Sequence, residues 1–276
     1  IEDGEIVGLL GPNGAGKSTT MNILTGFLEQ TEGEVIIDGF DTLKKPKKAK
    51  KEIGYMPEGV PLYTDLTVKE FVTYMAEIKQ VEKKSRKEKV EKIIEQTGLK
   101  DVEKKLIKNL SRGYKQRVSM AGALVGEPKI LILDEPTVGL DPKQITEIRN
   151  LIKELGKTHT VILSSHILSE VSQICNKVVI INKGKIVAVD TPENLENKVN
   201  NNNCIYVMVE DTENKVEEIK DKIKGVKKIE LVEENKDGTK QYLIEAEKDI
   251  DIRKTIFSEF AKENITIFEM RKADTT

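Results

Sequence analysis

The chain has 276 residues, enough for one large or two modest domains with a sizeable core. Its 45 basic and 47 acidic residues nearly balance, so the charge gives no reason to expect a nucleic-acid partner. No apolar stretch approaches the length of a membrane-spanning helix, and two isolated cysteines argue against a disulfide framework or a cysteine metal site and fit a reducing compartment.

The first predicted element is a buried strand, Glu5–Leu10, followed by a glycine-rich turn and a helix that begins near Gly16. The turn matches G-x-x-x-x-G-K-[ST], the phosphate-binding P-loop. Its glycines let the backbone curl into a nest of N–H groups, and the helix adds the positive end of its dipole. Lys17 can reach the β- and γ-phosphates, and the Ser18 hydroxyl can ligate Mg²⁺. The nucleotide-binding candidates here are Gly11, Pro12, Asn13, Gly14, Ala15, Gly16, Lys17, Ser18 and Thr19.

A lysine-rich segment lies between the next two predicted strands, Glu34–Asp38 and Ile53–Met56. Lys44–Lys51 holds six lysines around Pro46. This segment is either a patch for a membrane surface or partner, or a solvated helix or loop. We favour the solvated helix or loop, because runs of exposed lysine are common.

A helical stretch follows these strands. Thr67–Glu70 reads as a capping box that opens a helix to about Lys79, and a second helix covers about Lys84–Gln96. We expect residues of about 65–125, inserted between strands, to form a helical subdomain.

From residue 112 onward, predicted helices and strands alternate, which indicates an α/β fold with a mainly parallel sheet. A hairpin closes this part of the chain, and Thr191 caps one more helix. The expected elements are helix Arg112–Val125, strand Ile130–Leu133, a helix from Asp141 to Leu155, strand Thr160–Ser164, helix Ile167–Ile174 and strands Lys177–Asn182 and Lys185–Val189.

The pattern changes after Asn200–Asn203, which we interpret as a linker between domains 1–200 and 204–276. The second domain should be a small α+β, ferredoxin-like unit of βαββαβ order. It contains no glycine-rich loop and no histidine, so we expect a binding or assembly module. Its expected elements are strand 204–210, helix 213–223, strand 227–233, a turn at Asp237-Gly238, strand 240–246, helix 250–262 and strand 265–271.

Two carboxylates end the apolar strand Ile130–Leu133. A carboxylate at a strand tip beside a P-loop can hold Mg²⁺ directly or through water, a role that suits Asp134. The next residue, Glu135, is placed to polarise an attacking water.

The segment Leu110–Arg117 resembles the signature motif of ATP-binding cassette (ABC) proteins, usually Leu-Ser-Gly-Gly-Gln followed by x-Gln-Arg. The matching residues are Leu110, Ser111, Gly113, Gln116 and Arg117, whereas Arg112 and Tyr114 depart from the family pattern. Gly139–Asp141 resembles the D-loop of the family, and Ser164–His166 resembles its switch-histidine segment. Ile53–Pro57 resembles the run into the Q-loop, although Glu58 stands where glutamine is usual.

The resemblance covers about residues 1–200 and implies a P-loop NTPase core of ABC type. Two such domains would pack head to tail, as a homodimer or heterodimer, with two ATP molecules between them. Ser111 and Gly113 of one chain would cap the γ-phosphate of the ATP held by Lys17 and Ser18 of the other. Asp141 in the D-loop is a further nucleotide-binding candidate.

The resemblance also implies catalytic roles. Lys17, Glu135 and His166 are the catalytic candidates: Glu135 would orient water, and His166 would hold the γ-phosphate. Ser18, Asp134 and Glu58 would hold Mg²⁺. Family members stack adenine on an aromatic residue ahead of the P-loop strand, and we expect that residue and further strands to precede Ile1.

Hydrolysis would separate the dimer and move a bound membrane permease, which places the chain at the cytoplasmic face of the cell membrane. Glu58, the variant signature and the extra C-terminal domain resemble the bacterial exporter branch, whose members power efflux of drugs, peptides, lipids or polysaccharides. An alternative is a soluble ABC ATPase in translation, repair or chromosome structure, although the sequence shows no second cassette, coiled coil or metal cluster. A regulatory module that does not hydrolyse ATP is disfavoured by Lys17, Asp134, Glu135 and His166. His159 belongs to no motif, and we expect it at the surface.

Overall fold

The computed structural model describes residues 1–59, 62–195, 203–211, 215–235, 238–247 and 250–272. By their contacts these residues divide into two compact units, Ile1–Pro192 and Glu193–Thr276. The predicted linker lies almost entirely outside the described residues, as does Asp237 of the predicted turn. No helix in the described ranges is long and apolar enough to span a membrane.

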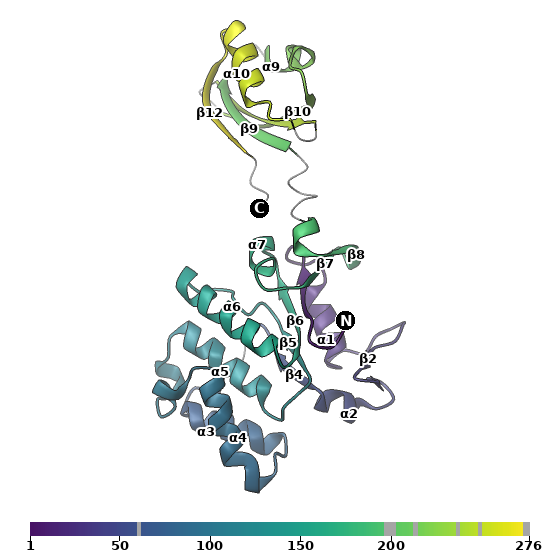
Figure 1. The fold of residues 1–276 in the computed structure, drawn as a ribbon, viewed down its shortest axis with the longest axis vertical. Helices are drawn as coiled ribbons and strands as arrows, with labels where there is room; N and C mark the ends of the chain where they lie inside the picture. The colour runs from purple at the N-terminus through teal and green to yellow at the C-terminus, as the bar shows by residue number, and fades with distance from the viewer. Residues whose placement is uncertain (60–61, 196–202, 212–214, 236–237, 248–249, 273–276) are drawn as a thin grey trace. The chain divides into compact units, whose positions relative to one another are not determined.

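A six-stranded sheet forms the centre of the first unit, in the order β4-β5-β6-β1-β7-β8 (Figure 1). Its first five strands run parallel, and β8 pairs antiparallel with β7. Every residue of β1 and β6 is buried, as expected for central strands that are covered on both faces. This confirms the predicted mainly parallel sheet. The strands are β1 (Ile6–Leu10), β4 (Ile53–Met56), β5 (Ile130–Leu133), β6 (Thr160–Ser165), β7 (Lys177–Asn182) and β8 (Lys185–Asp190).

Helices pack on both faces of this sheet. Met21 and Ala49 belong to a cluster with Leu9 on one face. On the other face, Gly156 ends the helix α6. A Cβ added at Gly156 would lie 2.4 Å from the Ile6 side chain, so the end of this helix approaches β1 closely. The covering helices are α1 (Lys17–Leu24) and α2 (Pro46–Lys51) on the first face and α6 (Pro142–Gly156) and α7 (Leu168–Val171) on the second.

Between β4 and β5 the chain forms a group of helices that lie together in Figure 1. The predicted capping box is present: the Glu70 N–H donates to Thr67 Oγ1 at 3.2 Å, and the Thr67 N–H donates to Glu70 Oε2 at 2.8 Å. These elements are α3 (Val68–Ile78), α4 (Lys83–Gln96), the 3₁₀ turns Lys100–Val102 and Ile107–Asn109, and α5 (Arg112–Leu124).

Three predicted elements are shorter in the structure. The strand expected over Glu34–Asp38 is reduced to β2 (Ile36–Ile37), paired with β3 (Phe40–Asp41). The helix expected over Ile167–Ile174 is only α7, because the chain must turn back for the Asn176 N–H to donate to the Ile6 carbonyl at 2.8 Å. The helix expected over 213–223 is divided into α9 (Lys215–Glu218) and the 3₁₀ turn Lys220–Lys222.

Residues Pro46–Lys51 of the lysine-rich segment form α2, Lys44 and Lys45 lie in the turn before it, and all six lysines are exposed. The solvated helix is therefore the conformation observed.

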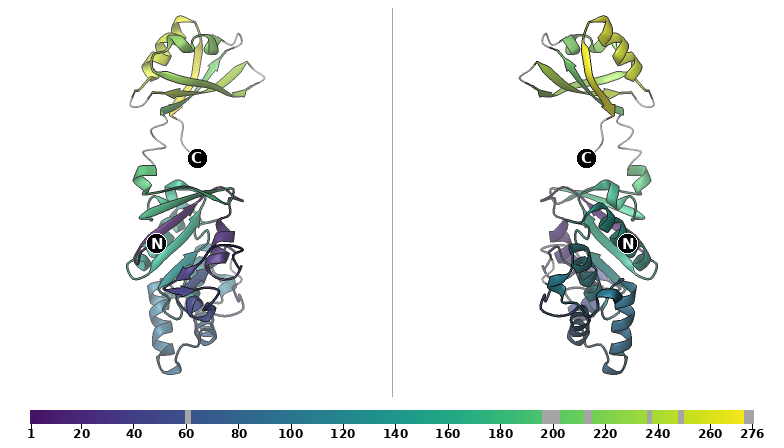
Figure 2. Two further views of the ribbon diagram at one scale, coloured as in Figure 1. Left: turned by 90° about the vertical axis from the view of Figure 1, so that its right-hand side faces the viewer. Right: turned by 90° about the vertical axis from the view of Figure 1, so that its left-hand side faces the viewer.

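The second unit has a four-stranded antiparallel sheet in the order β10-β11-β9-β12. Two helices, α9 and α10, cover one face of it (Figure 2). Their buried side chains, such as Val216 and Phe260, form one apolar cluster with strand residues such as Val207 and Ile244. The remaining elements are β9 (Asn203–Glu210), β10 (Val226–Glu234), β11 (Thr239–Ala246), α10 (Arg253–Lys262) and β12 (Thr266–Lys272).

Candidate functional site

The P-loop connects the carboxyl end of β1 to the first residue of α1. Gly16 has φ 108°, a conformation that L side chains rarely adopt. At Gly11, an added Cβ would lie 2.3 Å from the Ile181 carbonyl oxygen, so the close approach of β7 requires glycine. The backbone of this loop therefore has the curled form that its glycines allow.

A hollow of about 410 Å³ opens over this loop. It collects residues that follow the carboxyl ends of β1, β4, β5 and β6, the edge where parallel sheets bind ligands. Sequence regions more than 100 residues apart thus meet at one place. The lining residues are Asn13, Gly14, Gly16, Lys17, Ser18, Thr19, Glu58, Glu135, Val138 and His166.

Glu135 lies between two nitrogen-bearing side chains in this hollow. Its Oε1 is 3.3 Å from Lys17 Nζ, and both side chains are only 6% exposed. Its Oε2 is 3.1 Å from His166 Nδ1. Lys17 also donates to the carbonyl oxygens of Gly11 at 2.8 Å and Pro12 at 3.3 Å. All three predicted catalytic side chains therefore form one chain of contacts beside the P-loop.

Asp134 lies behind the hollow rather than lining it. It is 2% exposed, and its Oδ1 accepts a hydrogen bond from Ser164 Oγ at 2.5 Å. Burial, and then the charge of Asp134, raise the pKa of Tyr55 on the neighbouring strand β4. The Tyr55 hydroxyl donates to Asn22 at 3.2 Å, so α1 and β4 are joined next to this carboxylate.

A second hollow of about 430 Å³ shares Glu58, Glu135 and Val138 with the first. The start of α5 and the segment Gly139-Leu140 form its other walls. Gln116 Nε2 donates to the Pro136 carbonyl at 2.7 Å, which ties α5 to the residue after Glu135. The signature helix is thus bonded to the carboxylate segment of its own chain.

The predicted residues Ser111, Gly113 and Asp141 do not line the P-loop hollow. Ser111 Oγ caps α5 by accepting from the Tyr114 N–H, and Asp141 Oδ1 caps α6 by accepting from the Gln144 N–H at 2.9 Å. Gly113 is buried, with the Gln144 side chain 3.1 Å from where its Cβ would be. The structure therefore keeps these three apart from the cluster around Lys17.

A family model described as ABC transporter matches residues 1–138, and a second model, an AAA domain, matches residues 107–172. The linearmycin resistance ATP-binding protein LnrL of Bacillus subtilis strain 168 is 35% identical over 210 residues, which cover 76% of this chain and 68% of LnrL. The chain belongs to the ABC transporter family, as an ATP-binding subunit.

Two solved structures of this family resemble the chain. CbiO1 of Clostridium perfringens, part of the ABC transporter complex cbiONQ, matches with a TM-score of 0.66 and 31% identity over 72% of this chain and 82% of CbiO1. A dimeric ATP-binding cassette in a post-hydrolysis state with ADP and phosphate matches with a TM-score of 0.62 and 28% identity, over 70% of this chain and 87% of that one. The chain is an ATPase with the ABC fold.

Sequence reasoning missed two contacts of this ABC site. Ser164 stands in the quoted switch segment, yet nothing in the pattern showed that its hydroxyl reaches Asp134. Gln116 was noted only as a match to the signature, although it reaches the Pro136 carbonyl. Both contacts join residues at least 20 positions apart, so only the register of the folded sheet and helices brings them together.

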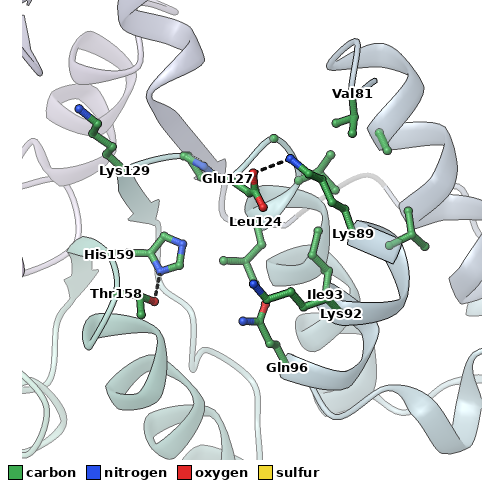
Figure 3. A pocket seen from close by; sticks show the side chains of 15 residues that line it. Val81, Lys89, Lys92, Ile93, Gln96, Leu124, Glu127, Lys129, Thr158 and His159 are labelled. Atoms are coloured by element: carbon green, nitrogen blue, oxygen red, sulfur yellow. Dashed lines mark hydrogen bonds and ion pairs between the residues drawn. The ribbon is translucent and has the colours of Figure 1, made fainter. Parts of the chain in front are cut away.

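A further hollow of about 300 Å³ lies at the opposite, amino ends of β5 and β6 (Figure 3). His159, expected at the surface, is half-buried in its wall, and its Nδ1 contacts the Leu155 carbonyl at 3.0 Å. Across the hollow, Lys89 and Glu127 form an ion pair at 2.6 Å. This hollow shares no lining residue with the hollow over the P-loop.

Proposed function

We propose that this ABC ATPase binds ATP with Mg²⁺ between its first unit and that of a second subunit, either another copy or a close relative. The observation that carries the proposal is that the signature residues lie apart from the other nucleotide-binding motifs of the same chain. Lys17, Glu135 and His166 meet in one hollow, whereas Ser111 and Gly113 lie outside it. These two signature residues do not line the hollow of their own chain. They are therefore suited to contact a nucleotide bound by a partner subunit. The dimeric post-hydrolysis cassette supports this arrangement.

The donor set fits Mg²⁺, which prefers hard oxygen ligands. The Ser18 hydroxyl and the Glu58 carboxylate both line the hollow, and Asp134 lies directly behind it. Because Asp134 Oδ1 accepts from Ser164, we assign its Oδ2 to the ion or to a water on the ion. The bound ion would neutralise charge on the phosphate oxygens.

Phosphate binding and water activation follow from the contact chain at Glu135. The N–H groups of Asn13, Gly14 and Gly16–Thr19 and the positive end of α1 would receive the phosphates, since Pro12 has no N–H and those of Gly11 and Ala15 donate to backbone carbonyls. A phosphate would replace Glu135 and the loop carbonyls as the partner of Lys17. The freed Glu135 carboxylate would orient water and take its proton, while His166 holds the γ-phosphate and that water in place.

We further propose that hydrolysis drives a separate membrane permease at the cytoplasmic face of the membrane. A groove of about 260 Å³ is lined by residues of β4, α3 and α5, and by the exposed Phe27. Such a groove suits an apolar segment of a permease held by the helical subdomain of about 65–125. The name of LnrL, a linearmycin resistance protein, supports export.

The second unit supports the proposal of a ferredoxin-like assembly module over residues 204–276. Its described elements follow one another as strand, helix, strand, strand, helix and strand, with the sheet order β10-β11-β9-β12. Its apolar cluster holds residues of the second unit alone, which suits a domain that folds independently.

The experiment uses Glu135→Gln, which should keep ATP binding but lose about 100-fold or more in turnover. Light scattering of this variant with ATP and Mg²⁺ should show a dimer, because nucleotide is trapped between subunits. Adding Ser111→Arg should return it to a monomer without abolishing ATP binding, since Ser111 lies outside the hollow. A persistent monomer of Glu135→Gln at high concentration would count against the dimer, and unchanged turnover would remove Glu135 from its role.

A further inference from the structure

Ser164 touches both carboxylate residues at the end of β5 with one hydroxyl. It is the penultimate residue of β6 and is 0% exposed. Its Oγ donates to Asp134 Oδ1 at 2.5 Å and accepts from the Glu135 N–H at 2.8 Å. A serine hydroxyl has one proton and lone pairs to accept with, so both capacities are used on adjacent residues of one segment.

The Glu135 backbone needs this support. Its φ is 47°, in the left-handed region that residues other than glycine rarely enter. Such a conformation persists only when its surroundings determine it, and it is concentrated at functional sites. The bond from the Glu135 N–H to Ser164 is a buried contact that fixes this backbone. The Glu135 carboxylate on the same residue meets Lys17 and His166.

The strand register explains why Ser164 has this position. In the parallel pair β5 and β6, Leu133 lies beside Leu163. Asp134 follows Leu133, and Ser164 follows Leu163. The pairing of the two strands therefore places the serine beside the carboxylate. The hydroxyl of Ser164 therefore donates to Asp134 across the end of the strand pair.

We infer that Ser164 is a positioning residue for ATP hydrolysis, holding Asp134 toward the ion and fixing the backbone from which Glu135 acts. The inference rests on the proposed roles of these two carboxylates. Ser164 does not line the hollow and acts only through them. Partners that orient ligands of an ion typically change ion affinity or activity by about 10- to 100-fold when removed.

The neighbouring Ser165 provides a matched control. It is also buried, at 2% exposure, and it follows Ser164 in the same strand. Its Oγ instead donates to Glu170 Oε2 at 3.4 Å and accepts from the Ile167 N–H at 3.1 Å. Removing either hydroxyl leaves a similar vacancy in the same strand, but only Ser164 contacts Asp134 and Glu135.

The test compares Ser164→Ala with Ser165→Ala in the full chain, measuring kcat, the KM for ATP, the Mg²⁺ concentration that gives half-maximal rate, and the equilibrium binding of ATP with and without Mg²⁺. For Ser164→Ala we expect kcat to fall about 10- to 100-fold and the Mg²⁺ requirement to rise, with little change in metal-free nucleotide binding. For Ser165→Ala we expect less than about threefold change in either. Equal losses in the two variants, or wild-type kcat and Mg²⁺ dependence in Ser164→Ala, would overturn the inference.

Ser164→Thr and Ser164→Val form a second pair of nearly equal shape, of which only threonine keeps the hydroxyl. Threonine should be the more active of the two, and equal activities would overturn the inference even if alanine unfolds the chain. The Mg²⁺ readout separates this inference from the proposed function. If Glu135→Gln kept full turnover, the role of Glu135 would fall, while a raised Mg²⁺ requirement in Ser164→Ala would still support positioning of Asp134.

Discussion

The two units of the chain both bury charged groups, but they use them differently. In the first unit, Lys17 and Glu135 are buried at the edge of a hollow of about 410 Å³ that can admit a ligand. In the second unit, the buried Asp211 accepts from the Tyr242 hydroxyl at 2.7 Å and from two backbone N–H groups at the start of α9, at 2.8 and 3.3 Å. Burial of charge therefore indicates a reaction site only where the charged groups face an open volume.

One buried lysine in each unit shows the same difference between the units. Lys17 and Lys240 are each 6% exposed, and each forms an ion pair with a glutamate. The glutamate paired with Lys17 is the buried Glu135, whereas the glutamate paired with Lys240 is Glu234, which is 60% exposed. Similar burial thus accompanies a proposed role toward phosphate in one unit and a contact with an exposed glutamate in the other.

The largest expected effect separates these two lysines. Lys17→Met should lower ATP turnover by about 100-fold or more, because a cation aimed at the transferring phosphate is lost. Lys240→Met, at equal burial, should leave turnover near that of the original protein. Phosphate release at saturating ATP measures both. If the two variants lost activity to the same degree, the distinction between the units would be wrong.

A smaller effect is expected from Tyr242→Phe in the second unit. The Tyr242 ring is 1% exposed, and its loss of a hydroxyl would remove a donor from the buried Asp211 carboxylate. The free energy of unfolding of this unit should fall by about 1.5–3 kcal/mol, the usual contribution of a hydrogen bond to a charged group. Hydrogen exchange of amides in the second unit of the full chain measures this change.

ATP turnover supplies the control for Tyr242→Phe, and it should not change. A loss of turnover together with unchanged exchange would mean that the second unit takes part in the reaction rather than only in assembly.

Local signals in the sequence were enough to predict most elements. The strands Ile53–Met56 and Ile130–Leu133 have the predicted bounds, because runs of four residues between turn residues are long enough for a strand and too short for a typical helix. The capping box at Thr67 fixed the start of α3 for the same local reason. The helix expected over Ile167–Ile174 was too long, since the return of the chain to β1 is a tertiary constraint that no local pattern shows.

The candidate site divides in the same way. The motifs around Lys17, Glu135 and His166 predicted residues that do meet in one hollow. The hydrogen bonds of Ser164 depend on the register between β5 and β6, which sequence spacing does not determine. The same holds for the contact of Gln116 with the Pro136 carbonyl, which depends on how α5 packs beside the sheet.

The smallest expected effect uses the cysteines, of which each unit has one. Burial raises the pKa of the Cys175 thiol to about 12. This thiol packs against Gly8 of β1, where an added Cβ would lie 3.0 Å from the sulfur. Burial raises the pKa of Cys204 as well, with the charges of Glu245 and Glu230 adding to it, but this thiol is only partly buried. Since the thiolate is the reactive form, both thiols should be alkylated slowly at pH 8 and faster as the pH rises.

In the native chain, iodoacetamide should modify Cys204 faster than Cys175, by about tenfold or more, because access and thiolate content both favour Cys204. In concentrated urea the two should react alike, which provides the reference rate for each thiol. Mass spectrometry of peptides from each unit measures both rates. Equal native rates well below the urea value would mean that the sheet of the first unit opens as readily as that of the second. The tight packing of α7 on β1 would then contribute less to the stability of the ATPase core than its geometry indicates.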